Sequence, residues 1–553
     1  MILPFTILRR LDCILEPTRD EVRSLAAKYD GGALDVQVKK ATGLGFYNTS
    51  EFDFPSLIKD PAGLRANLVD YITSFSSNVD IFERFKFENE LATLDEKGRL
   101  YLIVEAFGDI DLHPNTISNS EMGDIFEELI RKFAEASNEE AGEHYTPRDA
   151  IRLIVDLLFA EDSDALREPG TVRTIYDPTA GTGGMLSVAE ERLLDRNPQA
   201  RLRLYGQEIN DQSYAICKSD MIAKGQDASN IRLGDTLIED LFADRTFDFC
   251  MSNPPYGVDW KAAKESVEKE RKDFGAASRF GPGVPAVSDG QMLFLMHLAH
   301  KMRPAAHGGG RAGIVLNGSP LFNGGAGSGP SEIRRWLLEN DLVEAIVALP
   351  TDMFFNTGIA TYVWVLDNTK REERRGKVQL IDASSMGTKM RKSLGSKRKE
   401  LSAEARDQIV ALYDAFNEAD PDLSKVFPTD EFGYWTITVE QPILDDDGNP
   451  VTDRKGKPKP DAKKRDTENV PFTYGGNQAG GGGCDATIAA YVDAEILPHV
   501  PDAWVDHKKT KVGYEIPFTR HFYKYVPPRP LAEIDSDLEE QITRIQVLLS
   551  EVE

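Results

Sequence analysis

The pattern of apolar residues changes along this chain, and the places where it changes suggest where its domains meet. From residue 1 to about 140 they are three or four positions apart, which predicts helices that bury one face. From about 141 to 415, short continuous apolar runs alternate with helical patterns, which predicts an α/β domain around a sheet. Beyond 416 the chain becomes polar and turn-forming before one last amphipathic stretch. We therefore expect an N-terminal helical domain (1–140), a central α/β domain (141–415) and a C-terminal region (416–553) with flexible loops and a terminal helix.

The strongest chemical signal is the loop Ser252–Tyr256, Ser-Asn-Pro-Pro-Tyr, which follows a predicted strand at 247–251. The exocyclic amino group of an adenine is a poor nucleophile because its lone pair is delocalised into the ring. Two fixed acceptors localise that lone pair, and the side chain of Asn253 and the backbone carbonyl of Pro254 can supply them. The prolines stiffen the loop, and Tyr256 offers a face for an unstacked base. The alternative is an ordinary Asn-Pro turn, but the segments upstream favour amino-group methylation.

A glycine-rich turn, Asp-Pro-Thr-Ala-Gly-Thr-Gly-Gly at 177–184, lies between an earlier predicted strand and a predicted helix. Gly181 and Gly183 let the backbone approach a ligand closely, which is typical of a nucleotide-binding βα unit. Asp177 precedes the turn, where a carboxylate would repel a pyrophosphate but would suit a cationic or polyhydroxyl ligand. S-Adenosylmethionine, which has an amino group and a sulfonium, meets that requirement and is the predicted cofactor.

Two further acids end predicted strands in the same domain. Glu208 follows the strand at 202–206, at the distance where a Rossmann-like site binds a ribose, and Asp235 ends the strand at 230–236. Asp235 is placed to accept a hydrogen bond from an adenine amino group. Each acid alone would more often be an ordinary surface residue. Because four successive strand ends carry polar groups at one edge of a sheet, we assign both acids to cofactor binding.

Together these motifs resemble those of the N6-adenine DNA methyltransferases, and specifically of the modification (M) subunit of type I restriction-modification systems. The resemblance rests on the turn at 177–184 and the loop Ser252–Tyr256. It extends to Gly-Glu-His-Tyr-Thr-Pro at 142–147, Ile-Leu-Arg-Arg-Leu-Asp at 7–12 and Tyr-Lys-Tyr-Val-Pro-Pro-Arg at 523–529. The last two stretches lie outside a methyltransferase core, so they separate a type I subunit from a solitary methyltransferase.

The resemblance implies a Rossmann-like methyltransferase domain with a mixed seven-stranded sheet, an N-terminal helical domain and a C-terminal helical extension. The site residues that it implies are, for S-adenosylmethionine, Tyr145, Thr146, Asp177, Gly181, Glu208 and Asp235, and for the target adenine, Asn253, Pro254 and Tyr256. A second aromatic residue usually closes on the flipped base in this family, and Phe322 is the candidate here. The implied partners are double-stranded DNA, a specificity (S) subunit, a second M subunit (an M2S1 core) and restriction (R) subunits where these are attached.

The charge of the chain bears on how it meets DNA. Its 553 residues carry a formal net charge of −26, which repels a polyanion, whereas DNA affinity normally comes from neutralised phosphates. This favours a subunit that takes affinity and sequence recognition from a partner. A local basic cluster remains at 389–399. Such a run is usually a solvated face, and the sequence leaves its contact with DNA open.

Composition argues against several other classes of protein. No long apolar run and no charged-then-apolar N-terminus is present, so we expect a soluble, cytoplasmic chain with no membrane partner. The four cysteines form no CxxC pair, and the eight histidines show no metal spacing. We therefore expect no zinc site, no disulfide framework and no metal in the reaction.

An apolar stripe runs along the last predicted helix. Its members are Ile534, Leu538, Ile542, Ile545, Leu549 and Val552. Their spacing of three and four positions predicts a helix that needs a partner surface. A short stripe more commonly folds back onto its own domain, but with the family resemblance we prefer docking onto the coiled-coil spacer of the specificity subunit.

Three classes of function remain open to the sequence. The first, which we favour, is an adenine methyltransferase in a multisubunit modification and restriction complex. The second is an RNA or protein methyltransferase, because the same acceptor pair suits any planar amino group. The long helical N-terminal part and the terminal helix argue against it. The third is a non-catalytic DNA-clamping or assembly module, which would have no need of the intact tetrapeptide Asn253–Tyr256.

Overall fold

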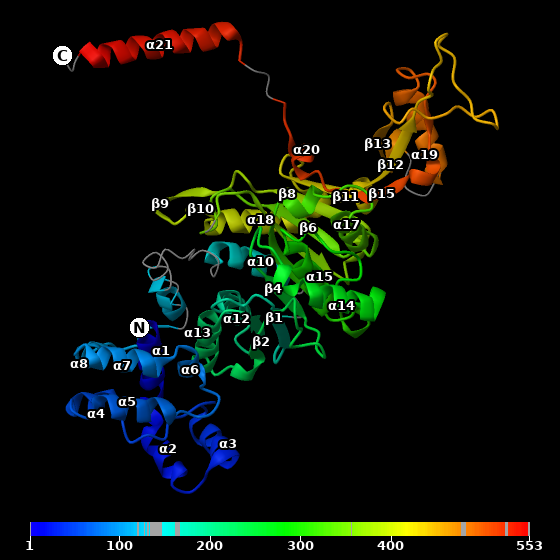
Figure 1. Ribbon diagram of the computed structural model, residues 1–553. Helices are drawn as coiled ribbons and strands as arrows, with labels where there is room; N and C mark the ends of the chain where they lie inside the picture. The colour runs from blue at the N-terminus through cyan, green and yellow to red at the C-terminus, as the bar shows by residue number, and fades with distance from the viewer. Residues whose placement is uncertain are drawn as a thin grey trace. The chain divides into compact units, whose positions relative to one another are not determined.

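A computed structural model gives the architecture of the chain (Figure 1). It describes residues 2–118, 121–126, 128–129, 132, 146–160, 166, 168–355, 357–476, 483–525 and 529–550. The chain divides into two compact units, residues 1–516 and residues 517–553.

Helices make up the first part of the first unit. They are α1 (Ile2–Leu15), α2 (Arg19–Ala26), α3 (Gly31–Thr42), α4 (Phe54–Lys59), α5 (Leu64–Thr73), α6 (Ile81–Arg84), α7 (Phe87–Glu96) and α8 (Leu100–Gly108). Apolar faces pack inward, and the ring of Phe5 lies against those of Phe87 and Phe107. The buried carboxylate of Asp12 accepts a hydrogen bond from the hydroxyl of Tyr71 at 2.6 Å. The helical N-terminal part predicted from the periodicity is therefore confirmed, whereas its boundary at residue 140 stays a prediction.

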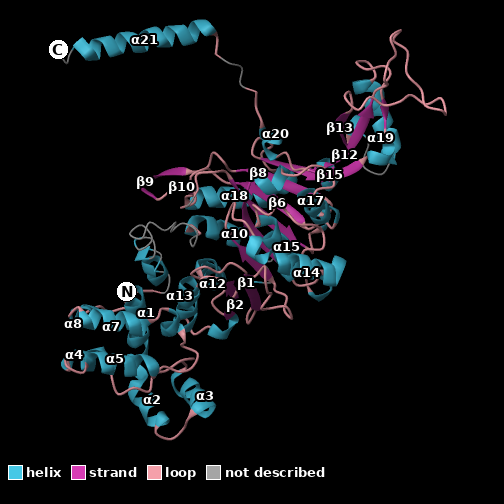
Figure 2. Ribbon diagram, in the orientation of Figure 1, coloured by secondary structure: helices cyan, strands magenta, loops and turns pink. Residues whose placement is uncertain are grey.

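A nine-stranded sheet forms the centre of the first unit, in the order β11-β8-β6-β7-β5-β4-β1-β2-β3 (Figure 2). The strands are β1 (Val172–Asp177), β2 (Arg201–Glu208), β3 (Ile231–Leu233), β4 (Phe249–Ser252), β5 (Arg311–Asn317), β6 (Val343–Ala348), β7 (Thr361–Asp367), β8 (Lys377–Asp382) and β11 (Ser424–Pro428). β7 runs antiparallel between β5 and β6, whereas β3, β2, β1, β4 and β5 are parallel neighbours. The predicted mixed sheet is confirmed and includes all seven predicted strands, β1 to β7, but it has nine strands and not seven. β8 and β11 extend it beyond β6.

Helices cover both faces of this sheet (Figure 2). They are α10 (Arg148–Ala160), α12 (Gly184–Arg196), α13 (Asp211–Ala223) and α18 (Ala403–Ala415) on one face, and α14 (Lys264–Phe274), α15 (Gln291–Lys301) and α17 (Gly329–Glu339) on the other. On β4, the ring of Phe249 packs against Phe159 of α10. On β1, the hydroxyl of Tyr176 lies 3.1 Å from Nε2 of His297 on α15. Because successive side chains along a strand point to opposite faces of the sheet, each face packs against its own set of helices.

A hairpin and a second sheet lie outside this layer. The hairpin pairs β9 (Thr388–Leu394) with β10 (Lys397–Glu400). The second sheet consists of β12 (Gly433–Glu440), β13 (Asp466–Pro471), β14 (Trp504–Val505) and β15 (Lys511–Tyr514), and α19 (Gly483–Tyr491) packs against it. We did not predict this sheet, having expected loops before the terminal helix.

Residues 441–465, between β12 and β13, which we call the 441–465 arm, contain two consecutive turns at 445–449 and 453–457 and a third at 461–464. Asp445 accepts a hydrogen bond from the backbone N–H of Asn449 at 2.8 Å, and Asp453 accepts one from that of Lys457 at 3.0 Å. The side chains of these two acids thus close the first two turns, while the lysines of the arm stay exposed.

The second unit contains α20 (Phe518–Phe522) and α21 (Leu531–Ser550), so the predicted terminal helix is present. Leu538, Ile542 and Ile545 of its apolar stripe are 55%, 53% and 55% exposed. The side chain of Leu549 and the whole of Val552 lie outside the described residues. Neither α21 nor any other described helix combines the length and apolarity needed to span a membrane.

Candidate cofactor and active site

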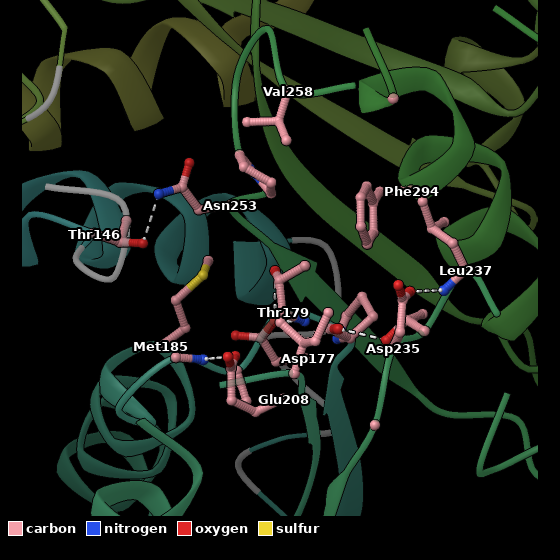
Figure 3. A pocket seen from close by; sticks show the side chains of 18 of the residues that line it. Thr146, Asp177, Thr179, Met185, Glu208, Asp235, Leu237, Asn253, Val258 and Phe294 are labelled. Carbon is pink, nitrogen blue, oxygen red and sulfur yellow. Dashed lines mark hydrogen bonds between the residues drawn. The ribbon is translucent and has the colours of Figure 1, made fainter. Parts of the chain in front are cut away.

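A cavity of about 350 Å³ lies at the edge of the large sheet where β1, β2 and β4 end (Figure 3). Crevices at the carboxyl ends of parallel strands are where open α/β sheets bind ligands. The predicted site residues that line it are Thr146, Asp177, Gly181, Glu208, Asp235 and Asn253. The fold therefore brings together side chains from distant parts of the sequence. Tyr145, also predicted, lies outside the described residues.

Asp177, the last residue of β1, is a fully buried acid in this lining. Its Oδ1 accepts hydrogen bonds from the backbone N–H and the hydroxyl of Thr179, at 2.9 and 3.2 Å. Its Oδ2 has no hydrogen-bond partner within the described residues. Burial, with a smaller contribution from the charge of Glu208, raises the pKa of Asp177 to about 7. A buried carboxylate with one unmatched oxygen suits the cationic group of a ligand, which would compensate its charge.

Glu208, at the end of β2, connects this strand to the glycine-rich turn. Its Oε2 accepts a hydrogen bond from the backbone N–H of Gly181 at 2.8 Å, and its Oε1 accepts one from that of Asn210 at 2.8 Å. These bonds fix the carboxylate within the lining of the cavity. Because a carboxylate offers about four acceptor positions, it can accept from the hydroxyls of a ligand as well.

Asp235 follows β3 and stands across the cavity from Glu208 (Figure 3). Its Oδ1 accepts a hydrogen bond from the backbone N–H of Leu237 at 2.8 Å. The apolar side chains of Leu237 and Phe294 complete this wall. An apolar wall beside a carboxylate suits a purine ring, which presents a flat face and an amino group.

Gly183 supports the turn from outside the cavity lining. Its φ is +84°, a backbone region that favours glycine, and a Cβ there would lie 2.8 Å from Sγ of Cys217 on α13. This position therefore requires glycine, because the turn passes close to α13. The predicted contact of Gly183 with the cofactor stays a prediction.

The Asn-Pro-Pro-Tyr loop leaves β4 and carries Asn253 into the lining (Figure 3). The amide Nδ2 of Asn253 donates to Oγ1 of Thr146 at 2.9 Å, and its Oδ1 accepts from the hydroxyl of Tyr256 at 2.5 Å. Burial raises the pKa of Tyr256 well above its ordinary value, so the phenol stays protonated and able to donate. The carboxamide is held from both ends, which fixes the direction of its oxygen.

The other residues predicted to hold the base are not part of the described cavity lining; they are Pro254, Tyr256 and Phe322. Tyr256 packs edge-on against Phe354, with ring centroids 6.1 Å apart, and neither ring is part of the described lining. Pro254 is buried. Phe322, which ends the short helix α16 that begins at Ser319, is 54% exposed and lies outside that lining. Its assignment as the second stacking aromatic stays a prediction.

Several lining residues were missed because their sequence pattern gives no sign of ligand contact. They are Ile151, Met185, Leu237, Val258, Trp260 and Phe294. Each has an apolar side chain of the kind that normally fills a core. The one available signal was proximity to a motif, as for Met185 after the glycine-rich turn and Val258 after the Asn-Pro-Pro-Tyr loop. No group of three His, Cys, Asp or Glu residues in the described ranges is placed to hold a metal ion.

Known proteins share both the sequence pattern and the fold. The methylase subunit of the type I restriction enzyme MjaIX from Methanocaldococcus jannaschii is 30% identical over 298 residues, which are 53% of this chain and 49% of the relative. That of MjaVII, from the same organism, is 31% identical over 327 residues, 58% of this chain and 51% of the relative. The chain spans about half the length of the curated relatives it matches.

The crystal structure of a type I restriction-modification system methyltransferase subunit from Streptococcus thermophilus has the same fold, at 23% identity. The TM-score is 0.59, with 77% of this chain and 89% of that chain covered. A family model described as HsdM N-terminal domain matches residues 1–107. The model described as N-6 DNA Methylase matches residues 118–435, more than half of the chain. The chain therefore belongs to the N-6 DNA methylase family.

Proposed function

We propose that this chain is the modification subunit of a type I restriction-modification complex and methylates the N6 amino group of adenine in DNA. The observation that carries the proposal is the fixed carboxamide of Asn253, which lines the same cavity as the buried carboxylate of Asp177. One group suits an adenine amino group and the other suits a cationic cofactor. The domain boundaries at 140 and 415 and a cytoplasmic location belong to the same proposal.

The residues of the cavity fit S-adenosylmethionine, which supplies an electrophilic methyl group when bound. The unmatched Oδ2 of Asp177 would accept a hydrogen bond from its amino group. Glu208 would accept from its ribose hydroxyls, and Asp235 from its adenine amino group. The apolar side chains of Leu237 and Phe294 would contact its purine. The backbone of the glycine-rich turn would lie close to the ligand at Gly181.

Asn253 and Pro254 would act on the target base. The side-chain oxygen of Asn253 and the backbone carbonyl of Pro254 would each accept one amino hydrogen of adenine N6. This directs the nitrogen lone pair toward the methyl donor and stabilises the transition state more than the ground state. Because Thr146 and Tyr256 already hold the carboxamide, little reorganisation is needed when the base arrives.

Tyr256 would have two tasks. Its hydroxyl holds the oxygen of Asn253, which has a second lone pair for the adenine amino group. Its ring would give a base that has left the duplex a surface on which to stack. The base must therefore enter beside Tyr256 without displacing its hydroxyl. Phe322 remains the proposed second aromatic.

The proposed partners are double-stranded DNA, a specificity subunit and a second modification subunit, with restriction subunits where these are attached. The net charge of −26 supports dependence on a partner for DNA affinity. The exposed apolar stripe of α21 supports docking onto a helical part of the specificity subunit. Sequence recognition would then belong to that subunit.

The test is a methylation assay with the full chain, its specificity subunit, plasmid DNA and S-adenosylmethionine. Mass spectrometry of the digested DNA should detect N6-methyladenine. Asn253→Ala should reduce its formation by at least about a hundredfold, the size of effect seen when one transition-state hydrogen-bond partner is removed. Cofactor binding by calorimetry should change little. Undiminished turnover, or methyl groups in RNA or protein in place of DNA, would contradict the proposal.

A further inference from the structure

The β9–β10 hairpin carries the basic cluster whose contact with DNA the sequence left open. Lys389, Arg391 and Lys392 on β9 and Arg398 on β10 are exposed. None of the four makes an ion pair within the described part of the chain. In a chain with a net charge of −26, this hairpin is a local reversal of charge.

Three cations of the hairpin share one of its faces. Side chains alternate along a strand, so Lys389 and Arg391 point to the same side, roughly 7 Å apart along β9. Lys399 lies directly opposite Lys389 in the antiparallel register. Like charges in directly opposite positions destabilise a strand pair. An anion over this face would relieve that repulsion.

A buried ion pair fixes the hairpin to the methyltransferase fold. The Nζ of Lys397 lies 3.0 Å from Oδ2 of Asp149 and donates to the carbonyl oxygen of Met353 at 3.1 Å. The backbone N–H of Ser396 donates to the carbonyl oxygen of Phe355 at 3.0 Å. The exposed cations are thus held at a defined place relative to the loop at 352–355.

Both anchors of the hairpin lead to residues around Asn253. Phe354, in the loop that receives the hairpin, packs against the ring of Tyr256, which in turn holds the oxygen of Asn253. Asp149 lies in the first turn of α10, close in sequence to Thr146, whose hydroxyl accepts from the amide of Asn253. The hairpin is therefore attached beside the loop that would hold the target base.

We propose that the β9–β10 hairpin binds the phosphate backbone of double-stranded DNA next to the flipped adenine. This inference rests on the proposed function, because it takes DNA as the substrate. A strand from which a base has been extruded must be held by its backbone, and Lys and Arg make such contacts without reading sequence. The hairpin thus contributes affinity and position, while specificity stays with the partner.

The test compares two double variants of the full chain, each in complex with the specificity subunit, that remove the same charge. Lys389→Gln with Arg391→Gln alters the hairpin. Lys455→Gln with Lys457→Gln alters equally exposed cations of the 441–465 arm, and neither strand flanking that arm lines the cavity.

Fluorescence anisotropy with a labelled DNA duplex over a series of salt concentrations gives the slope of log affinity against log salt. The slope should fall in magnitude by roughly two for the hairpin variant, about 0.9 per lost phosphate contact, and stay unchanged for the arm variant. Unaltered cofactor affinity in both variants shows that they are folded.

Equal losses in the two variants, an unchanged slope in the hairpin variant, or no binding by the unaltered complex at the lowest salt would overturn the inference. An RNA duplex bound more tightly than DNA, with the same loss on substitution, would overturn it as well. The methylation assay separates this result from the proposed function. If the unaltered complex forms no N6-methyladenine, the proposed function fails. If it does, and the KM for DNA of the hairpin variant matches that of the arm variant, only the hairpin assignment fails.

Discussion

At the scale of single residues, the polar groups of the site are held by hydrogen bonds within the protein, and one of them keeps a buried oxygen without a partner. Thr146 and Tyr256 hold Asn253, and the backbone of Gly181 holds Glu208. Groups fixed in this way need little reorganisation when a ligand arrives. That group is Asp177: Thr179 holds its Oδ1, but its Oδ2 is buried without a partner in the described structure. This carboxylate lowers the stability of the ligand-free protein and gains from a cationic ligand.

Replacing Asp177 with asparagine should change how stability depends on pH. The pKa of Asp177 is about 7 in the folded chain and about 3.9 in an unfolded one. Because the folded state holds this proton more tightly, the carboxyl group destabilises the unaltered protein progressively as pH rises from about 4 to about 7. The variant lacks that loss. Its Tm minus that of the unaltered protein should become more positive between about pH 4 and about pH 7 in thermal unfolding without cofactor, and should level off above that range. A Tm difference that does not depend on pH would mean that the pKa of Asp177 is not raised in the folded chain.

Gly183→Ala should destabilise the chain more than a left-handed backbone alone explains. Gly225 is the matched control, because its φ is +71° against +84° for Gly183 and a Cβ there would meet nothing within 4 Å. Gly225→Ala should lower the free energy of unfolding by about 1–2 kcal/mol through backbone strain. Gly183→Ala adds the contact with Cys217 and should cost about 1–3 kcal/mol more. Urea unfolding measures both variants, and equal losses would show that the turn does not pack tightly on α13.

Whether a residue of the site could be predicted depended on whether its side chain is polar or apolar. Asp177, Glu208, Asp235 and Asn253 were predicted because a polar residue at a strand end is a chemical signal, and all four line the cavity. Leu237 and Phe294 were missed because apolar lining residues look like core residues in sequence. Phe322 was chosen by analogy with a family position; it is 54% exposed and is not among the described lining residues.

At the scale of elements, continuous apolar strands were predictable and short half-exposed ones were not. β6 and β7 are buried along their whole length, and most of their residues are apolar, so they stand out as strands in the sequence. β13 is mostly exposed and β14 is only a two-residue strand, so neither produces a pattern that stands out from a loop. The small sheet forms because β12, which precedes the 441–465 arm, pairs with β13, β14 and β15, which all follow it, and a local pattern cannot reveal such pairing.

The apolar stripe of α21 should matter for assembly and not for folding. Leu538→Glu with Ile542→Glu should leave the Tm of the isolated chain within about a degree, because both side chains are already half exposed. The same variant should no longer co-purify with the specificity subunit, since two buried carboxylates would oppose docking.

Thr543→Glu is the control for this stripe, because its position lies on the opposite side of the same helix. It should leave co-purification intact. Retained association of the stripe variant, or a marked drop in its Tm, would show instead that α21 packs within its own chain.

At the scale of the whole molecule, an acidic chain is proposed to act on an acidic polymer. The net charge of −26 opposes DNA binding, and the exposed cations of the β9–β10 hairpin offset it only locally. The proposed division of labour resolves the conflict: this chain would supply cofactor binding, methyl transfer and a local backbone contact, and the specificity subunit would supply most affinity and all sequence recognition. The family match over residues 118–435 agrees with a catalytic core, and residues 441–465 lie beyond it.

The most direct test follows the methyl group from cofactor to base. The full chain and its specificity subunit are incubated with DNA and S-adenosylmethionine labelled at the methyl carbon, and the digested DNA is analysed by mass spectrometry. We expect labelled N6-methyladenine with the unaltered chain and almost none with Asn253→Ala, although both bind the cofactor equally. Label found at another position or in another polymer, or an equal yield from Asn253→Ala, would contradict the assignment of this loop as the site of adenine methylation.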